Sequence, residues 1–168
     1  EGFSPCRPGL WVVAVVPALN EQLTVGATIR ALLRAGVASV IVVDDGSADC
    51  TGQIAADAGA AVVRRERNGG KGVTVAVGLS LARDQAQAVG RAQAVGRAQA
   101  CAPRADIDPG CVVFADADLG DSAEEIAKVI APVADGSADM AVAGFPAAIG
   151  GGFGLAVGLA RAGIRRLC

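Results

Sequence analysis

The stretch Trp11-Val12-Val13-Ala14-Val15-Val16-Pro17-Ala18-Leu19-Asn20-Glu21 decides the fold of this chain of 168 residues. Its first six residues form an unbroken apolar run that ends at Pro17. A run of this kind predicts a β-strand that is buried on both faces, as in the interior of a parallel sheet. The polar pair Asn20-Glu21 then lies just beyond the carboxyl end of that strand.

Helical and strand patterns alternate along the rest of the chain. Apolar residues at helical spacing predict helices over residues 23–35 and 51–58, from 73 onward, and over 122–134. Short apolar runs predict further strands over residues 40–43, 61–63, 111–115 and 139–143. Such alternation is typical of βαβ units with right-handed crossovers. We therefore predict an α/β fold with a mainly parallel, doubly wound sheet.

Polar clusters follow several of the predicted strands, and ligands of doubly wound sheets bind beyond the carboxyl ends of the strands. One cluster is Asp116-Ala117-Asp118, in which strand alternation directs both carboxylates to the same side. Two hard oxygen ligands at this spacing suit Mg²⁺ or Mn²⁺ shared with a substrate diphosphate. The alternative interpretation of the triplet is a turn that caps the next helix.

Two further motifs also allow a structural and a binding interpretation. The run Asp44-Asp45-Gly46-Ser47 either caps the next helix or directs a carboxylate toward a nucleobase or ribose. The run Asn68-Gly69-Gly70-Lys71-Gly72 is a cationic, glycine-rich loop at the start of a helix, which suits a phosphate or nucleotide contact. It does not match the Walker A pattern, and no G-x-G-x-x-G follows the first strand, so both of those nucleotide-binding motifs fit poorly.

The composition excludes several classes of function. The chain contains no His, which rules out Ser-His-Asp, Cys-His and His-zinc chemistry. The net charge is −2, and the cations are spread along the chain without a dense basic stripe, which argues against nucleic acid as a partner. The five cysteines include no C-x-x-C pair, so we expect a reduced, cytoplasmic protein rather than a disulfide framework.

The motifs at residues 16–21, 43–47, 68–72 and 114–118 together resemble those of the GT-A glycosyltransferases of family 2. The similarity is nearest to the dolichyl-phosphate mannosyltransferase-like and glucosyl-3-phosphoglycerate synthase-like branches. It implies a Rossmann-like GT-A fold, which is a three-layer sandwich. It also implies an inverting transfer of a sugar from a UDP- or GDP-sugar donor, with Mg²⁺ or Mn²⁺ as cofactor.

The resemblance implies roles at the matching positions of this chain. The residues implied to bind the nucleotide are Pro17, Ala18, Asn20, Glu21, Asp44, Asp45, Gly70, Lys71, Asp116 and Ala117. Asp45 would hydrogen-bond the base, and Asp118, with Asp116, would bind the metal ion. No general base can be assigned. An acceptor phosphate is already ionised and would need none, which fits the polyprenyl-phosphate branch. The acceptor stays open, with a lipid phosphate and a phosphorylated small molecule as candidates.

The chain also departs from the family pattern. Many relatives carry Gly-Ser-Arg after the last predicted strand, where this chain has Gly144-Phe145-Pro146, so the phosphate-binding arginine is absent there. Many relatives also extend further, which implies that the acceptor side here is minimal or cut short. Two alternatives therefore stay open. One is a nucleotide-sugar-binding module without catalysis, and the other is a sugar nucleotidylyltransferase, whose Gly-rich signature after the first strand is missing.

We expect three segments along the chain. Residues 1–10 form an N-terminal extension, residues 11–143 the nucleotide-sugar-binding core, and residues 144–168 a Gly-rich acceptor-side loop and a C-terminal helix. The uncharged run 140–160 is long enough to span a bilayer. Its glycines and Pro146 favour a loop and short helix instead, near either a membrane surface or a soluble acceptor. The oligomeric state stays open.

A short internal repeat lies within the predicted core. The hexapeptide Ala-Gln-Ala-Val-Gly-Arg occupies residues 86–91 and again 92–97, and a partial copy follows at 98–100. Inserting six residues rotates the following part of a helix by about 240°, which a packed helix could not accommodate. We therefore expect the repeat to lie in an exposed helix end or loop.

Overall fold

The computed structural model describes residues 11–96 and 110–143. Its elements are β1 (Val12–Ala18), α1 (Val25–Arg34), β2 (Ser39–Asp44), α2 (Thr51–Asp57), β3 (Ala61–Arg64), α3 (Lys71–Gly96), β4 (Cys111–Phe114), the 3₁₀ helix η1 (Gly120–Glu125) and α4 (Ile126–Ala134). The described strands form a sheet in the order β3-β2-β1-β4, and every neighbouring pair is parallel. The predicted α/β fold with a parallel sheet is confirmed.

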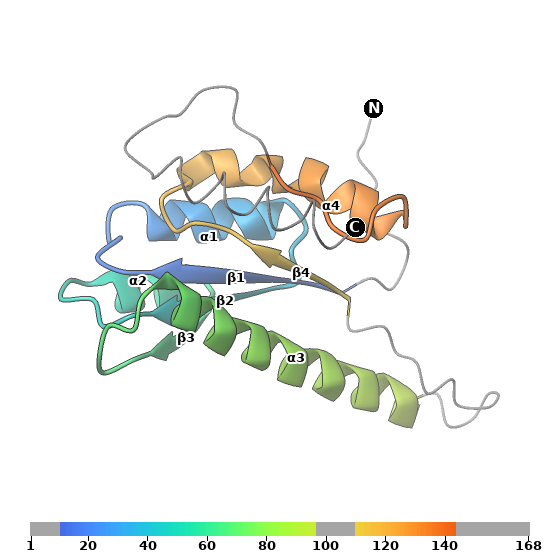
Figure 1. Ribbon diagram of the computed structural model, residues 1–168, viewed down its shortest axis with the longest axis horizontal. Coiled ribbons are helices and arrows are strands. Elements are labelled where there is room, and N and C mark those ends of the chain that lie inside the picture. The colour runs from blue at the N-terminus through green and yellow to red at the C-terminus, as the bar shows by residue number, and fades with distance from the viewer. Residues whose placement is uncertain (1–10, 97–109, 144–168) are drawn as a thin grey trace, which may run out of the picture.

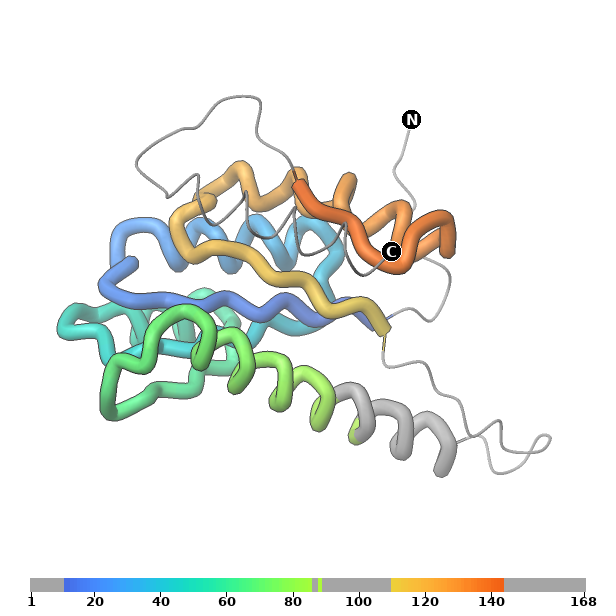
Figure 2. The backbone as a smooth tube through the Cα atoms, in the orientation of Figure 1, coloured from blue at the N-terminus to red at the C-terminus, as the bar shows by residue number. Residues whose placement is uncertain are grey.

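Helices cover both faces of this sheet, which gives three layers (Figure 1). α1, α2 and α4 pack on one face, where every second residue of β1 from Val12 onward joins their core. α3 packs on the opposite face against Val13 and Val15 of the same strand. The backbone trace shows the same arrangement, with α3 on the far side of β1 from α1 (Figure 2). The three-layer sandwich implied by the resemblance is therefore confirmed.

β1 is buried on both faces, as its apolar run predicts. Val12 is 2% exposed, and the next four residues are 0% exposed. Parallel register then brings the carboxyl ends of three strands together. Ala18 pairs with Asp44 of β2, and Val15 pairs with Phe114 at the end of β4. The loops that follow these strands therefore meet at one edge of the sheet.

The strand predicted over residues 139–143 is wrong. The structure has no regular element there, and Met140 and Val142 are 62% and 76% exposed. A strand needs a hydrogen-bonded neighbour, and no described strand pairs with this run. An apolar run in the sequence predicts a strand but does not by itself provide the neighbouring strand with which it must pair. The helix predicted over residues 122–134 is present, but its first part is the 3₁₀ helix η1 and only its second part is α4.

Several predictions concern residues outside the described ranges. These are the segments 1–10 and 144–168 and residues 97–100 of the repeat. α3 continues through the first copy of the repeat and into the second, as far as Gly96. Among the described helices, none combines the length and the apolar content that crossing a membrane requires.

α3 approaches the sheet closely at Gly78. A Cβ atom at this position would lie 2.2 Å from Cγ1 of Val15 and 3.3 Å from Cγ2 of Val43. The first of these distances is far inside van der Waals contact, so the helix can lie this near to β1 only because residue 78 has no side chain.

Gly78→Ala should lower the free energy of unfolding by roughly 1–2 kcal/mol, because the overlap with Val15 outweighs the gain in helix propensity. Gly72→Ala is the matched control, since it lies in the first turn of the same helix and its Cβ would meet nothing within 4 Å. We expect this control to be neutral or slightly stabilising. Urea denaturation measures both values, and equal stability of the two variants would contradict the close packing of α3.

Candidate functional site

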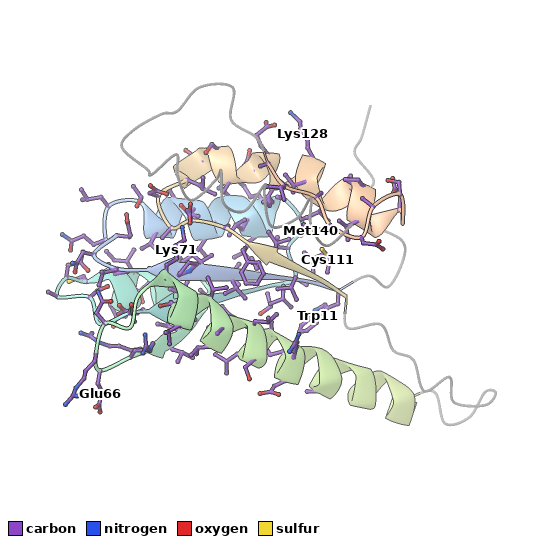
Figure 3. The ribbon with its side chains drawn as sticks, viewed as in Figure 1. Trp11, Glu66, Lys71, Cys111, Lys128 and Met140 are labelled. Atoms are coloured by element: carbon purple, nitrogen blue, oxygen red, sulfur yellow. The ribbon has the colours of Figure 1, made fainter. Side chains whose placement is uncertain are left out.

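A pocket of about 330 Å³ lies at the carboxyl ends of β1, β2 and β4. It is lined by the end of β1 and by the loops after β1, β2, β3 and β4, together with the first turn of α3. The lining residues are Pro17, Ala18, Leu19, Glu21, Asp45, Asn68, Gly70, Lys71, Thr74, Asp116, Ala117 and Asp118. Figure 3 shows Lys71 near this end of the sheet, with Trp11 and Cys111 near the opposite end.

The pocket brings together all of the predicted site residues except Asn20 and Asp44. Asn20 has a positive φ of 57°, a conformation that asparagine adopts more readily than most residues. Its backbone amide donates to Oγ of Ser47 at 2.9 Å, and its Oδ1 accepts from the amide of Ala48 at 2.8 Å. Asn20 therefore joins the loop after β1 to the loop after β2, and its side chain does not line the pocket.

Asp44 is buried beneath the same turn. Its Oδ1 accepts from the amide of Ser47 at 2.8 Å, and its Oδ2 lies 3.9 Å from Nε of Arg64. Oδ2 has no hydrogen-bond partner among the described residues, and a Cβ at Gly52 would lie 3.0 Å from it. Of the two interpretations of this motif, Asp44 thus fits the structural one, a carboxylate that holds the turn between β2 and α2.

Asp45 points the other way and holds the glycine-rich loop. Its carboxylate accepts from the amide of Gly69 at 3.1 Å and from the amide of Gly70 at 2.9 Å, and it forms an ion pair with Arg65. Gly70 has a φ of 80°, which few residues other than glycine adopt. Asp45 therefore fixes the loop that forms one wall of the pocket.

The charge of Asp45 is stabilised by these contacts. Burial of the side chain, which is 4% exposed as a residue, favours the neutral acid. The amides of Gly69 and Gly70 and the guanidinium of Arg65 outweigh that effect, so the pKa of Asp45 lies below its ordinary value of 3.8. The carboxylate is consequently ionised at neutral pH.

Asp116 and Asp118 lie on the opposite wall. Ala115 and Ala117 are buried at 4% exposure each, whereas both carboxylates are exposed and line the pocket. The predicted alternation of buried and exposed residues is present, but β4 ends at Phe114 and the carboxylates lie in the segment that follows it. The ammonium of Lys71 forms an ion pair with Oδ1 of Asp116 across the pocket.

The side chains of this wall can be compared with what a divalent metal ion requires as ligands. No group of three or more His, Cys, Asp or Glu in the described ranges could hold a metal ion. The described part of the chain therefore offers two candidate carboxylate ligands in the pocket, Asp116 and Asp118. This set fits Mg²⁺ or Mn²⁺ only if water and substrate oxygens complete the coordination, as is usual for Mg²⁺ beside phosphates.

Sequence reasoning missed several residues of the site. Leu19 and Thr74 also line the pocket, and so does Asn68, which was already part of the glycine-rich loop motif. Thr74 donates to the carbonyl oxygen of Gly70 at 2.9 Å, but no pattern in the sequence directs it to the pocket. Arg65 carried no signal either, since its partner Asp45 lies in the loop after another strand.

Thr28 of α1 was also missed, and it supports the turn that carries the two carboxylates. Its buried hydroxyl donates to the carbonyl oxygen of Ala117 at 2.9 Å and accepts from the amide of Gly120 at 2.8 Å. A threonine inside an amphipathic helix gives no hint of a partner that lies 89 residues further along the chain.

Asp45→Asn should lower the melting temperature at neutral pH, because the ion pair with Arg65 and the charge-assisted bonds from the loop amides are lost. The folded-state pKa of Asp45 lies below the unfolded value of 3.8, so this stabilisation is complete well above pH 3.8 and is lost as the pH falls through the folded-state pKa. The difference from the unsubstituted chain should therefore narrow when the measurement at neutral pH is repeated at an acidic pH below 3.8.

The matched control for this prediction is Asp57→Asn, since Asp57 is an exposed carboxylate that accepts from Gln53 on the same helix. We expect it to change the melting temperature little at either pH. A difference for Asp45→Asn that stays constant across the pH range would contradict the proposed role of the charge.

The comparisons with known proteins concern most of the described chain. Residues 13–161 match the model of the family described as glycosyl transferase family 2. An uncharacterized protein of Methanocaldococcus jannaschii (MJ1222) is 30% identical over 131 residues, which cover 78% of this chain and 45% of that protein. The glucosyl-3-phosphoglycerate synthase of Mycolicibacterium smegmatis is 49% identical over 63 residues, which cover 36% of this chain and 21% of that enzyme.

Among solved structures, the chain is similar to glucosyl-3-phosphoglycerate synthase from Mycobacterium tuberculosis in complex with Mg²⁺ and UDP. The identity is 27%, the match covers 76% of this chain and 40% of that one, and the TM-score is 0.49. The chain thus spans less than half the length of each of these relatives. Because the family model covers most of its residues, the chain belongs to glycosyl transferase family 2.

Proposed function

We propose that this chain binds a nucleotide-diphosphate sugar, UDP- or GDP-linked, and transfers the sugar to a phosphorylated acceptor with the help of Mg²⁺ or Mn²⁺. The observation that carries the proposal is the pair of opposed walls in one pocket. One wall offers the cation of Lys71 at the start of α3, and the other offers the carboxylates of Asp116 and Asp118. Membership of family 2 supports the same reading.

The residues of the pocket have separate tasks in this proposal. Asp45 keeps the glycine-rich loop in place, and Pro17 and Leu19 give the nucleoside an apolar surface. Lys71 supplies positive charge for the diphosphate. Asp116 and Asp118 would hold the divalent ion, which when bound neutralises charge on the leaving nucleoside diphosphate.

The transfer itself is proposed as a direct displacement with inversion. The acceptor oxygen forms a bond to the anomeric carbon while the bond from that carbon to the diphosphate oxygen breaks. Glu21 accepts from the hydroxyl of Thr24 at 3.0 Å, and Asp45 is bound to the loop, so neither is assigned as a general base. An acceptor whose attacking atom is an ionised phosphate oxygen needs none. The relative from M. smegmatis is a glucosyl-3-phosphoglycerate synthase, which favours a phosphorylated small molecule. Where a hydroxyl of that molecule attacks, its proton passes to a base that is not assigned among the pocket residues.

Thermal denaturation of the full chain tests the donor and the metal together. UDP or GDP at about 100 times its dissociation constant should add roughly 2.7 kcal/mol of stability, and Mn²⁺ should increase the effect. Asp118→Asn should abolish the contribution of Mn²⁺, because it removes one of two carboxylate ligands. If neither nucleotide raises the melting temperature with or without Mn²⁺, the proposal fails.

Asp121→Asn is the matched control for this experiment. Asp121 lies three residues after Asp118, but its carboxylate faces Arg34 on the surface, outside the pocket. We expect this variant to keep the full effect of Mn²⁺. Release of free sugar or transfer to phosphorylated acceptors then separates an enzyme from a binding module, since a module would bind UDP or GDP without turnover.

A further inference from the structure

The ion pair between Lys71 and Asp116 occupies a position where a metal ligand is expected. Lys71 opens α3 and Asp116 follows β4, so the contact joins two walls of the pocket. Both side chains are well exposed, at 68% for Lys71 and 55% for Asp116. The ammonium is therefore held by one carboxylate and not by burial, and its four-carbon stem leaves it free to move.

Asp118, the second carboxylate of the motif, has no such cationic partner among the described residues. Asp118 makes no hydrogen bond or ion pair with any residue in the described ranges, although it lines the same pocket. One of the two candidate metal ligands is thus already neutralised by a cation of the protein, and the other is not.

A divalent ion and the ammonium of Lys71 cannot share Oδ1 of Asp116. Both are cations, and at contact distance their repulsion adds to the loss of the ion pair. A metal ion on Asp116 therefore weakens the ion pair and favours departure of the ammonium from the carboxylate. Once released, Lys71 remains at the N-terminal turn of α3, where the helix dipole also stabilises an anion.

We propose that Lys71 is an exchangeable counter-ion, which holds Asp116 before the metal binds and transfers to the donor diphosphate once the metal has displaced it. The first step, in which a metal ion replaces the ammonium of Lys71 at Asp116, is argued from the ion pair alone. The second step, in which Lys71 contacts the donor diphosphate, rests on the proposed function. By linkage, a residue that competes with the metal and assists the nucleotide makes the two ligands bind cooperatively.

The two steps predict that one substitution raises the affinity for Mn²⁺ and lowers the affinity for UDP. Lys71→Met removes the charge and keeps most of the apolar stem. Without nucleotide, it should tighten Mn²⁺ binding by about two- to fivefold, the size expected for losing an exposed ion pair. With Mn²⁺ saturating, it should weaken UDP binding by roughly tenfold, since a charge-assisted contact to phosphate is lost.

Electron paramagnetic resonance of free Mn²⁺, titrated into the full chain without nucleotide, measures the first effect. Calorimetric titration of UDP in saturating Mn²⁺ measures the second. Unchanged or weaker Mn²⁺ binding in Lys71→Met overturns the exchange, and so does a chain that binds no Mn²⁺. Unchanged UDP binding overturns the transfer. Tighter Mn²⁺ binding in a chain that binds no nucleotide supports the exchange and removes the proposed donor function.

Lys128→Met is the matched control, since the chain has two lysines and each forms an exposed ion pair. Lys128 pairs with Glu125 and lies on the α4 side of the molecule, away from Lys71 (Figure 3). It should change neither affinity. Equal tightening of Mn²⁺ binding by both variants would show an effect of net charge and overturn the exchange. Lys71→Arg, which keeps the charge, should stay near the unsubstituted chain in both titrations.

Discussion

The burial of β1 on both faces is the constraint on which the rest of the structure depends. A strand with helices on both sides and strands on both edges has no exposed surface along its length, so polar groups can follow it only at its ends. The sequence obeys this rule, with an apolar run up to Val16 and polar residues from Asn20 onward. The same constraint requires α3 to lie close to the sheet, which the missing side chain of Gly78 allows.

The spacing of apolar residues along the sequence was sufficient to predict the strands, the helices and the polar clusters at the strand ends. Both the spacing and the points where it is interrupted depend only on neighbouring residues. The sequence pattern also indicated that Asp116 and Asp118 face the same site, although both lie past the end of β4 in a turn that Thr28 holds. It failed at residues 139–143, where an apolar run has no partner strand among the described residues. It also could not find Arg65 or Thr28, because their roles are set by contacts between distant loops.

The two adjacent aspartates at the end of β2 show why a motif alone leaves roles open. β2 ends at Asp44 and Asp45 already lies in the loop, so the two carboxylates have different surroundings and different partners. Asp44 turns toward Gly52 and holds the turn, whereas Asp45 turns toward the amides of Gly69 and Gly70. The choice between the structural and the binding interpretation of this motif thus has a different answer for each residue.

The charges around the pocket give a physical reason for an order of binding. Arg65 neutralises Asp45, and Lys71 neutralises Asp116. Glu21 and Asp118 have no cationic partner in the described ranges, so the pocket carries an excess of negative charge. A nucleoside diphosphate is itself an anion and is repelled by that excess. In the proposed function, a divalent ion held by Asp116 and Asp118 would offset this excess and release the cation of Lys71, so the electrostatics would favour binding of the metal before the donor.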